Sequence, residues 1–427
     1  MKVAIIADDL TGANDSGVQF ARYGLKTSVL LDKNPDALER SDVIIFDTDS
    51  RSIPPEEAYT RVKEVAEFLS QNKFELIFKK IDSTMRGNVG IEIKAVYEVF
   101  QPDFVIIAPG FPKNQRQIIN GYHYLNNRLL HETEVALDPK TPVKESFLPK
   151  LLREQNVQNV AHINFEELYQ GASYLSKRFN QFKKENIKYV LFDSRSEEDL
   201  KQAVNVIREI GLSVIWAGSA GLAEVFPEYL SLQRKEWIPP FAKGYSPSLL
   251  VMGSVSSVGR QQLENVLADP RVQGIQMSSE RVVTDFETRN TEIQRIYDEA
   301  SKAIEKGKHI ALYSSGGSED IRLAFQAGER IGLNHTDICN IISQYLGSIA
   351  SRLINHYPIN RVILTGGDTA KQVFRQIGAS EFILLDEIEP GVPIGYVNSS
   401  KIIYAVTKAG SFGSLVVFTK AMQKLQG

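Results

Sequence analysis

Two adjacent aspartates, Asp8 and Asp9, directly follow a short apolar run, Val3 to Ala7. A continuous β-branched run of this length is typical of a strand buried on both faces. Carboxylates at the end of such a strand can orient a hydroxyl group and take part in proton transfer. The glycines around them match neither a dinucleotide fingerprint nor a Walker A loop. Because aspartate is also a common turn residue, a capping role is the alternative.

Two later apolar runs, 43–47 and 76–81, lead into residues that add positive charge and hydroxyl groups. The candidates here are Arg51, Lys79, Asp82, Ser83, Arg86, Gly87 and Asn88. An arginine can bind a carboxylate or a phosphate through two parallel hydrogen bonds, whereas a lysine acts as a point charge. Gly87 would let the backbone approach a ligand, and a helix beginning at Asn88 would present its N-terminus to an anion. The combination predicts a small anionic ligand with hydroxyl groups; ordinary surface ion pairs are the alternative.

Apolar runs in the second half of the chain end in glycine and hydroxyl residues. The candidates here are Ser254, Ser256, Gly366, Gly367, Asp368, Thr369 and Gly410. Backbone N–H groups in such strand-to-helix turns form nests that bind phosphate. Asp368 could also hold a cation or orient a hydroxyl group. Each turn alone is common in α/β proteins, but three of them after strands of one domain, at 253–257, 314–318 and 365–370, favour a phosphate-bearing ligand. The last turn, 408–413, adds a cation, Lys408, and two glycines.

Two proline-containing segments, 109–116 and 138–143, could form walls or lids of the first site or serve only as scaffold turns. Three histidines stand alone on unremarkable stretches and are expected to be structural. They are His123, His131 and His162.

Short apolar runs alternate with segments of helical period along the whole chain, which is typical of parallel strands joined by helices. Strands are predicted at 3–7, 27–31, 43–47, 76–81, 104–108, 160–164, 189–193, 213–216, 249–252, 309–313, 362–364 and 382–385. Helices are predicted at 15–23, 55–71 and 89–100, after Ser196, and near 259–268, 292–306 and 337–354. In open α/β sheets ligands bind at the carboxyl ends of the strands, where all the candidates lie.

The predicted fold is α/β with two domains, each with a mostly parallel sheet flanked by helices. The periodic pattern stops at residues 231–247, where three prolines and mixed charge indicate a linker. The domains would then span residues 1–230 and 248–427, with the active site in the cleft between them. Charged strand ends fall in the first domain and glycine-rich ones in the second, so each domain is expected to hold one substrate.

Overall composition is that of an ordinary globular protein of 427 residues. Lysine and arginine number 49 against 52 aspartates and glutamates, a net charge of −3 that argues against nucleic acid or an anionic membrane as a partner. The single cysteine, Cys339, and an N-terminal apolar stretch too short for a signal peptide predict a cytoplasmic protein. A homodimer is compatible with these features.

These two kinds of site together predict a kinase. The first domain, with its acidic and basic residues, would bind the acceptor, and the second, with its glycine-rich turns, would bind the nucleotide. Phosphoryl transfer needs in-line positioning, cations beside the phosphates and a carboxylate near the attacking hydroxyl. One alternative is an NAD-dependent hydroxy-acid dehydrogenase, although no strand is followed by the G-x-G-x-x-G pattern. Another is a non-catalytic sugar-acid-binding protein, which in the periplasm would require a signal peptide.

Six motifs of the chain resemble the four-carbon acid sugar kinase family in matching order. They are ADDLTGA at 7–13, KKIDSTMRGN at 79–88, PGFP at 109–112, DPKTPV at 138–143, GSAGLA at 218–223 and TGGDT at 365–369. The resemblance implies ATP-dependent phosphorylation, with Mg²⁺, of the 4-hydroxyl of D-threonate, D-erythronate or 3-oxo-tetronate. It also implies an N-terminal acid-sugar-binding domain and a C-terminal nucleotide-binding domain.

The resemblance assigns the charged candidates to acid-sugar binding, together with the neighbouring Ser83, Gly87 and Asn88. It assigns Ser254 or Ser256, residues 366–369 and Gly410 to the nucleotide. The catalytic candidates are Asp9 and Asp82, of which Asp9 is favoured as general base because it stands at the turn into the first helix. Members that act on 3-oxo-tetronates tend to have phenylalanine and threonine where this chain has Leu10 and Asn14. D-threonate is therefore the first choice of substrate.

Overall fold

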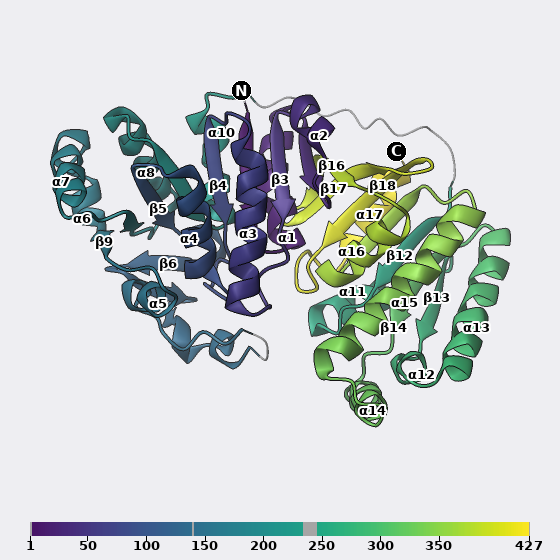
Figure 1. Cartoon of the computed structure of the whole chain (residues 1–427). Helices are drawn as coiled ribbons and strands as arrows, with labels where there is room; N and C mark the ends of the chain where they lie inside the picture. The colour runs from purple at the N-terminus through teal and green to yellow at the C-terminus, as the bar shows by residue number, and fades with distance from the viewer. Residues whose placement is uncertain (1, 139–140, 234–245, 427) are drawn as a thin grey trace. The chain divides into compact units, whose positions relative to one another are not determined.

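A computed structural model describes residues 2–138, 141–233 and 246–426 of the chain. The chain divides into two compact units, residues 1–236 and 237–427, and each is described by itself (Figure 1). The linker predicted at 231–247 falls mostly on residues 234–245, which lie outside the described residues. Both units combine a sheet with flanking helices, so the predicted α/β fold class is confirmed.

Within the described residues, the sheet of unit 1 has eight strands, all parallel, in the order β2-β3-β1-β4-β11-β5-β10-β9. The strands are β1 (Val3–Ala7), β2 (Thr27–Leu30), β3 (Val43–Asp47), β4 (Leu76–Lys80), β5 (Phe104–Ala108), β9 (Val160–Ile163), β10 (Tyr189–Phe192) and β11 (Val214–Gly218). The five residues of β1 are fully buried, as expected for a central parallel strand covered on both faces.

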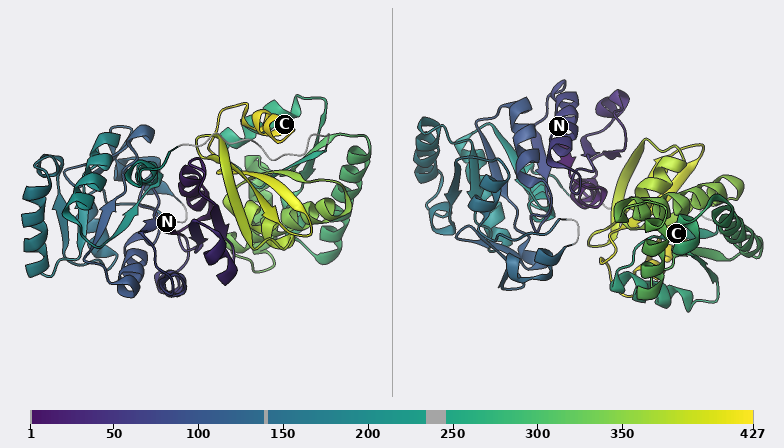
Figure 2. Two further views of the ribbon diagram at one scale, coloured as in Figure 1. Left: turned by 90° about the horizontal axis from the view of Figure 1, so that it is seen from above. Right: turned by 60° about the horizontal axis from the view of Figure 1, so that its bottom comes forward.

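Helices connect these strands and cover the sheet (Figure 2). They are α1 (Leu10–Ala21), α2 (Pro35–Arg40), α3 (Pro55–Ser70), α4 (Val89–Phe100), α5 (Leu148–Glu154), α6 (Phe165–Leu168), α7 (Ala172–Lys184), α8 (Glu197–Ile210), α9 (Ala220–Ala223) and α10 (Phe226–Tyr229). In Figure 1, α3 and α4 lie side by side in front of the sheet. Their apolar faces contribute to one large core that also includes residues of β3 and β5.

The position of β1 creates a switch point in unit 1. The chain winds from β1 outward to β2 and back to β3, and then crosses to the other side of β1 to form β4. The two directions of winding leave a crevice at the carboxyl ends of the strands flanking β1, where ligands of open α/β sheets bind. The loops after β1, β3 and β4 therefore meet at this point.

A separate three-stranded antiparallel sheet interrupts unit 1 between β5 and α5. It consists of β6 (Arg116–Ile119), β7 (Tyr122–Leu125) and β8 (Arg128–Leu129). Short 3-10 turns flank it: η1 (Pro112–Asn114), η2 (Leu130–Glu132) and η3 (Glu134–Leu137). These strands were not predicted, because none of them is a continuous apolar run: β6 reads RQII, β7 reads YHYL and β8 reads RL.

Unit 2 has a seven-stranded sheet in the order β13-β14-β12-β15-β18-β17-β16. Its strands are β12 (Ser248–Met252), β13 (Val272–Met277), β14 (His309–Ser314), β15 (Arg361–Thr365), β16 (Glu381–Glu389), β17 (Val392–Asn398) and β18 (Ile402–Lys408). The first five strands in this order are parallel, whereas β16, β17 and β18 form an antiparallel meander. Its helices are α11 (Ser257–Leu267), α12 (Ser279–Val283), α13 (Phe286–Glu305), α14 (Ser318–Glu329), α15 (His335–His356), α16 (Gly367–Gln376) and α17 (Val417–Gln426).

Every predicted strand is present within a few residues, but two helices begin five or six residues earlier than predicted. The helix expected near 292–306 begins at Phe286, where Asp285 caps it. The helix expected at 15–23 begins at Leu10, because the Asp9 side chain accepts a hydrogen bond from the Gly12 N–H and caps it. Asp15 therefore lies within α1 and not at its start. Strands β13, β17 and β18 were not predicted, since β13 alternates apolar with polar residues and the other two belong to the meander.

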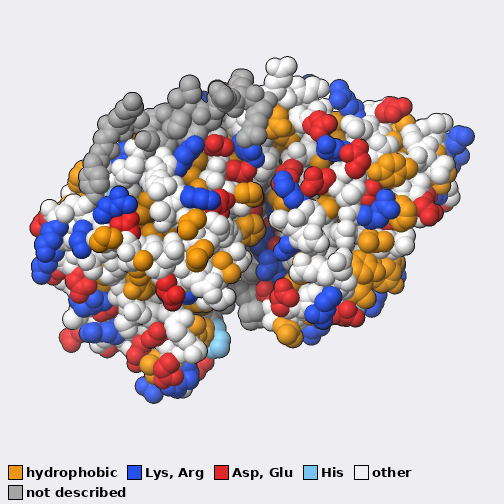
Figure 3. Space-filling view, turned by 180° about the vertical axis from the view of Figure 1, so that it is seen from behind, with side chains coloured by type: hydrophobic (Ala, Val, Ile, Leu, Met, Phe, Trp, Pro, Cys, Tyr) orange, Lys and Arg blue, Asp and Glu red, His pale blue; other side chains and the backbone are white. Residues whose placement is uncertain are grey.

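Charged side chains of both signs are interspersed over the face shown in Figure 3, in keeping with the net charge of −3. Among the described residues, no helix combines the length and the apolar character that crossing a bilayer would require.

Candidate active site

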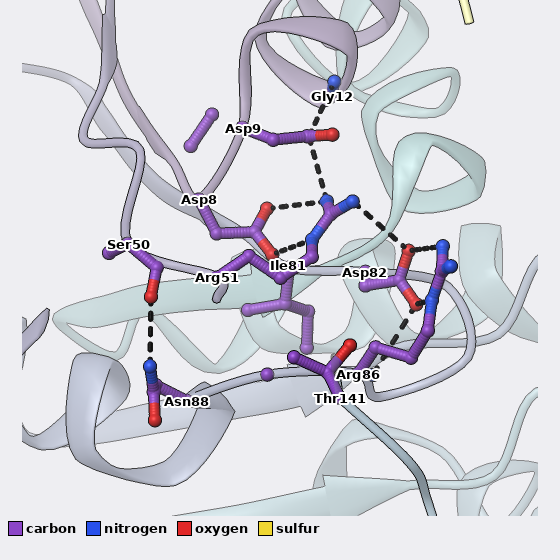
Figure 4. Close-up of polar contacts among 12 residues, drawn as sticks. Asp8, Asp9, Gly12, Ser50, Arg51, Ile81, Asp82, Arg86, Asn88 and Thr141 are labelled. Carbon is purple, nitrogen blue, oxygen red and sulfur yellow. Dashed lines mark hydrogen bonds and ion pairs between the residues drawn. The ribbon is translucent and has the colours of Figure 1, made fainter. Parts of the chain in front are cut away.

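The loops after β1 and β3 are joined by backbone hydrogen bonds that fix the position of Arg51. The Ala7 carbonyl accepts hydrogen bonds from the N–H and the hydroxyl of Thr48, and the Asp8 carbonyl accepts from the N–H groups of Ser50 and Arg51. The Arg51 side chain is thereby held against the aspartates that follow β1 (Figure 4).

Arg51 is the centre of the cluster. Its Nε lies 2.7 Å from Oδ2 of Asp8 and its Nη2 lies 3.0 Å from Oδ1, a bidentate pair. The same Nη2 lies 2.7 Å from Oδ1 of Asp9, and Nη1 lies 3.7 Å from Oδ1 of Asp82. One guanidinium therefore neutralises carboxylates from two loops, at a site where its own side chain is only 17% exposed.

Asp82 and Arg86 form a second bidentate pair beside the first. Arg86 Nε and Nη2 each lie 2.9 Å from one oxygen of Asp82, and Arg86 Nη1 lies 3.3 Å from Asp138. Thr84 also donates its hydroxyl and its N–H to Asp82. The predicted residues Asp8, Asp9, Arg51, Asp82 and Arg86 are therefore gathered into one ion-pair cluster, which we call the acid–arginine cluster.

The cluster keeps its buried carboxylates ionised. Burial alone would raise the pKa of Asp82, but the charges of Arg51 and Arg86 outweigh burial and hold this pKa well below its usual range. The pKa of Asp8 is likewise lowered: burial would raise it, but Arg51, Lys79 and Lys80 together outweigh the effect of burial. Asp9 is the most accessible of the three, with 27% of its side chain exposed. Its Oδ2 accepts no hydrogen bond from any described residue, so this oxygen is free to meet a hydroxyl group.

The two lysines of β4 point to opposite faces of the sheet. Lys79 is fully buried, and its Nζ lies 2.7 Å from Oε2 of Glu92 on α4, so it supports the cluster from inside the unit. Burial raises the pKa of Glu92, and Lys79 opposes that shift. Lys80 lies on the α1 side, where a Cβ at Gly12 would come within 2.7 Å of its Nζ and 2.8 Å of the Asp9 carboxylate. Lys80 is thus a cation next to Asp9 that the sequence-based list of site residues omitted.

Gly87 and Asn88 shape the loop after β4. Gly87 has φ +87° and lies so close to Arg51 that an added Cβ would stand 2.5 Å from its carbonyl oxygen. Asn88 precedes α4 and donates its amide to the Ser50 and Ile53 carbonyls. A pocket of about 490 Å³ opens beside them. Its other walls are the segment 141–145 and residues of α5. Ser83 is half-buried in the same loop.

In unit 2, the loops after three adjacent parallel strands, β12, β15 and β18, carry the predicted nucleotide residues. The Ser256 hydroxyl accepts from the Gly259 N–H at the start of α11, and Ser254 donates to Ser256. A Cβ at Gly410 would come within 2.2 Å of the Ser254 hydroxyl, so the loops after β12 and β18 touch. Gly366, with φ +97°, begins the turn into α16, where Gly367, Asp368 and Thr369 form the first turn. The Asp368 carboxylate is exposed.

Two cations of these loops were not assigned to the site from the sequence. Lys408, at the end of β18, is buried, and its Nζ donates to the Gly410 carbonyl at 3.0 Å. Arg260 donates to the Ser314 carbonyl at 2.8 Å, and among the described residues its Nε has no hydrogen-bond partner. Burial lowers the pKa of Lys408 to about 8 and also lowers the pKa of Arg260. Neither side chain forms an ion pair with a described carboxylate, unlike Arg51 and Arg86 in unit 1.

Phosphoryl transfer needs a carboxylate near the attacking hydroxyl and cations beside the phosphates. The acid–arginine cluster of unit 1 could supply the first, and the glycine-containing loops of unit 2 with Lys408 and Arg260 could supply the second. Residues 3–226 match the family model described as a sugar-binding N-terminal domain, and residues 249–418 match the one described as a nucleotide-binding C-terminal domain. The chain belongs to the four-carbon acid sugar kinase family.

Individual relatives agree with this membership. The chain is 31% identical to the D-threonate kinase of Salmonella typhimurium, over 97% of this chain and 96% of the relative. It is also 31% identical to the D-erythronate kinase of Heliobacterium modesticaldum, over 91% of this chain and 88% of that relative. A crystal structure of a Salmonella typhimurium LT2 protein shares the fold, with a TM-score of 0.81, 22% identity and coverage of 99% of both chains.

Proposed function

We propose that this protein is an ATP-dependent kinase that phosphorylates the 4-hydroxyl of a four-carbon sugar acid, with D-threonate as the first choice. The D-erythronate and 3-oxo-tetronate reactions are the alternatives, because one 31% identical relative is named for D-erythronate and a 25% identical one for 3-oxo-tetronate. The observation that carries the proposal is the charge pattern of the two strand-end sites. Unit 1 offers carboxylates to orient a hydroxyl, and unit 2 offers amides and unpaired cations to bind phosphates.

In the proposed reaction the sugar acid binds at the acid–arginine cluster, with Asp8, Asp9, Arg51, Asp82, Arg86 and the loop residues Ser83, Gly87 and Asn88 around it. Lys79 is buried behind the cluster, where it forms an ion pair with Glu92 and does not contact the substrate directly. The free oxygen of Asp9 accepts the proton of the attacking hydroxyl, while Arg51 holds Asp9 in place. ATP would bind at Ser254, Ser256, residues 366–369 and Gly410, where the backbone amides at the start of α16 are available to phosphate oxygens.

The donor set of unit 2 fits Mg²⁺ bound mainly through the nucleotide. Mg²⁺ in kinases typically takes one or two protein carboxylates and completes its shell with phosphate oxygens and water. The exposed carboxylate of Asp368 at the start of α16 suits this role, and no group of three or more potential ligands occurs in the described residues. The ion would neutralise charge on the phosphates. We place the protein in the cytoplasm, where ATP is available, and a homodimer remains a prediction.

The assay that tests the proposal measures ADP release from ATP and Mg²⁺ with each tetronate in turn. D-threonate is expected to give the highest kcat/KM, and phosphate should appear at its 4-position by NMR. The absence of ADP release with every four-carbon acid would contradict the proposal. The two remaining classes of function, an NAD-dependent dehydrogenase and a non-catalytic sugar-acid-binding protein, both predict that result.

Replacing Lys408 by methionine is expected to raise the KM for ATP about 10-fold, because a charge-assisted hydrogen bond to phosphate is lost. Methionine keeps an unbranched side chain in the buried position, although the cation–π contact with Phe418 is lost as well. The KM for the tetronate should stay within twofold. Steady-state kinetics with one substrate saturating checks both values. Lys420→Met is the matched control, since that lysine is exposed and pairs with Glu389. An equal rise in both KM values would remove Lys408 from the nucleotide site.

A further inference from the structure

The small sheet of unit 1 presents two polar side chains on its buried face. In the β6–β7 pair, Arg116 lies opposite Leu125 and Ile118 lies opposite His123. Opposite residues of an antiparallel pair share a face, and so do residues two apart on one strand, so these four side chains point the same way. Ile118, His123 and Leu125 are all buried. The two apolar ones belong to the core cluster that contains Met85, from the loop between Asp82 and Arg86.

Both polar groups on this face have unused hydrogen-bonding capacity within the described part of the chain. His123 is 0% exposed, and neither of its ring nitrogens has a partner there. Arg116 donates through Nη1 to the Asn114 carbonyl, but its buried Nε has no partner and no described carboxylate lies at ion-pair distance. A buried polar group without a partner costs about 1 to 3 kcal/mol, so such groups are usually reserved for a ligand or water.

The same two side chains lie in the electrostatic field of the acid–arginine cluster. Burial lowers the pKa of Arg116, and the charge of Asp82 opposes this shift while that of Arg86 adds to it. Burial also lowers the pKa of His123, to about 4. The charge of Asp82 opposes this shift, and the charge of Arg116 adds to it. His123 is therefore a neutral imidazole at physiological pH, with one donor and one acceptor nitrogen.

The cations at the centre of the cluster are poorly suited to a ligand carboxylate. Arg51 already holds Asp8 through two hydrogen bonds, and Arg86 holds Asp82 in the same way. A substrate carboxylate at either arginine would have to displace an aspartate or add a further negative charge beside it. Arg116 carries a full charge with no carboxylate attached, and its Nε–H belongs to the edge that arginine uses for bidentate carboxylate binding.

We propose that Arg116 binds the carboxylate of the sugar acid and that His123 hydrogen-bonds to the hydroxyl group next to that carboxylate. The inference rests on the proposed function and deepens it. The carboxylate of the substrate would bind at the small sheet, and its terminal hydroxyl would lie at Asp9. A neutral imidazole suits a hydroxyl, since both groups can donate and accept. The segment 109–116 then contributes to the site through its last residue.

The test compares binding of D-threonate with binding of its uncharged amide to the full-length protein, by calorimetry and by competition in the ADP-release assay. Arg116→Gln is expected to weaken D-threonate binding about 10- to 100-fold, the range for a lost hydrogen bond to a charged group, and to leave amide binding within threefold. Arg116→Lys should recover part of the loss. Arg128→Gln is the matched control, because Arg128 is an exposed arginine of the same sheet and should behave as the wild type.

Equal weakening of the acid and the amide in Arg116→Gln, or unchanged binding of both, would overturn the assignment. For His123, the wild type should bind D-threonate better than its 2-deoxy analogue, and His123→Gln should reduce that preference; an unchanged preference would show a purely structural histidine. If Arg116→Gln fails to fold, Arg116→Lys applies the same comparison. If the wild type releases ADP and the Arg116 variants bind D-threonate as the wild type does, this inference alone is wrong. If the wild type releases no ADP, the proposed function is wrong.

Discussion

Replacing Asp9 by asparagine is expected to lower kcat for the tetronate by about 100- to 1,000-fold, the contribution typical of a positioned general base. The substitution is unusually clean, because asparagine caps helices as well as aspartate does and keeps the hydrogen bond from the Gly12 N–H. What it removes is the negative charge on the oxygen that meets the substrate hydroxyl. Pre-steady-state measurement of ADP formation separates this effect from product release.

The comparison with Asp82→Asn decides between the two candidate bases. Both oxygens of Asp82 are engaged by Arg86, and its pKa is held well below the usual range, which makes it a weak acceptor for a proton. Asp82→Asn should therefore lower stability and raise the tetronate KM more than it lowers kcat. Asp285→Asn is the control for capping alone, because Asp285 caps α13 of unit 2 with the same geometry. A fall in kcat confined to Asp82→Asn would transfer the base role to that residue.

Replacing Arg51 by methionine is expected to destabilise unit 1 by about 3 to 5 kcal/mol at pH 7, the usual cost of removing one partner from a buried ion pair. Three carboxylates from two loops would lose their shared cation, and two of them, Asp8 and Asp82, are almost fully buried. Urea unfolding followed by the fluorescence of the buried Trp216, in a Trp237→Phe background, reports on this unit.

The pH dependence of that loss follows from the lowered pKa values of Asp8 and Asp82. A carboxylate with a lowered folded-state pKa adds stability above its unfolded pKa of about 4, and that stability is lost as the pH falls through the folded-state value. The difference between wild type and Arg51→Met should therefore be largest near pH 7 and shrink below about pH 4. Arg61→Met is the matched control: Arg61 forms an exposed pair with Glu57 on α3 and should cost less than about 1 kcal/mol. A loss that does not change with pH would contradict the electrostatic explanation.

Much of unit 1 could be predicted from the sequence because its central strands are continuous apolar runs. Residues after buried parallel strands must lie at one edge of the sheet, so the grouping of Asp8, Arg51 and Asp82 followed from the strand assignment alone. The assignment could not show which guanidinium holds which carboxylate. The assignment also could not show which of Lys79 and Lys80 lies beside Asp9. Neighbouring residues of a strand point to opposite faces of the sheet, but the sequence does not say which helix covers which face. In the structure Lys79 points to Glu92 on α4, and Lys80 points to Gly12 on α1.

The features that the sequence did not predict depend on contacts between distant segments. His123 was expected to be structural, and nothing in its neighbours indicates that β7 places it on the same face as Arg116. Lys408 was noted only as a cation in the last turn, because its burial depends on the meander formed by β16, β17 and β18. The early start of α1 was missed because aspartate and glycine are common both in turns and at helix starts. Only the hydrogen bond from the Gly12 N–H to the Asp9 side chain shows that these residues begin a helix.

The strand order of unit 1 also sets the order in which a growing chain can complete it. The strand β4 pairs with β1 on one side, but its other neighbour, β11, is synthesised only after β5, the small sheet, β9 and β10. Until Gly218 has left the ribosome, the edge of β4 is open, and open apolar edges invite pairing with other chains. Lys79 and Lys80 place charge on the last two residues of that edge. We therefore expect these two lysines to disfavour pairing of the open β4 edge with other chains until β11 is in place.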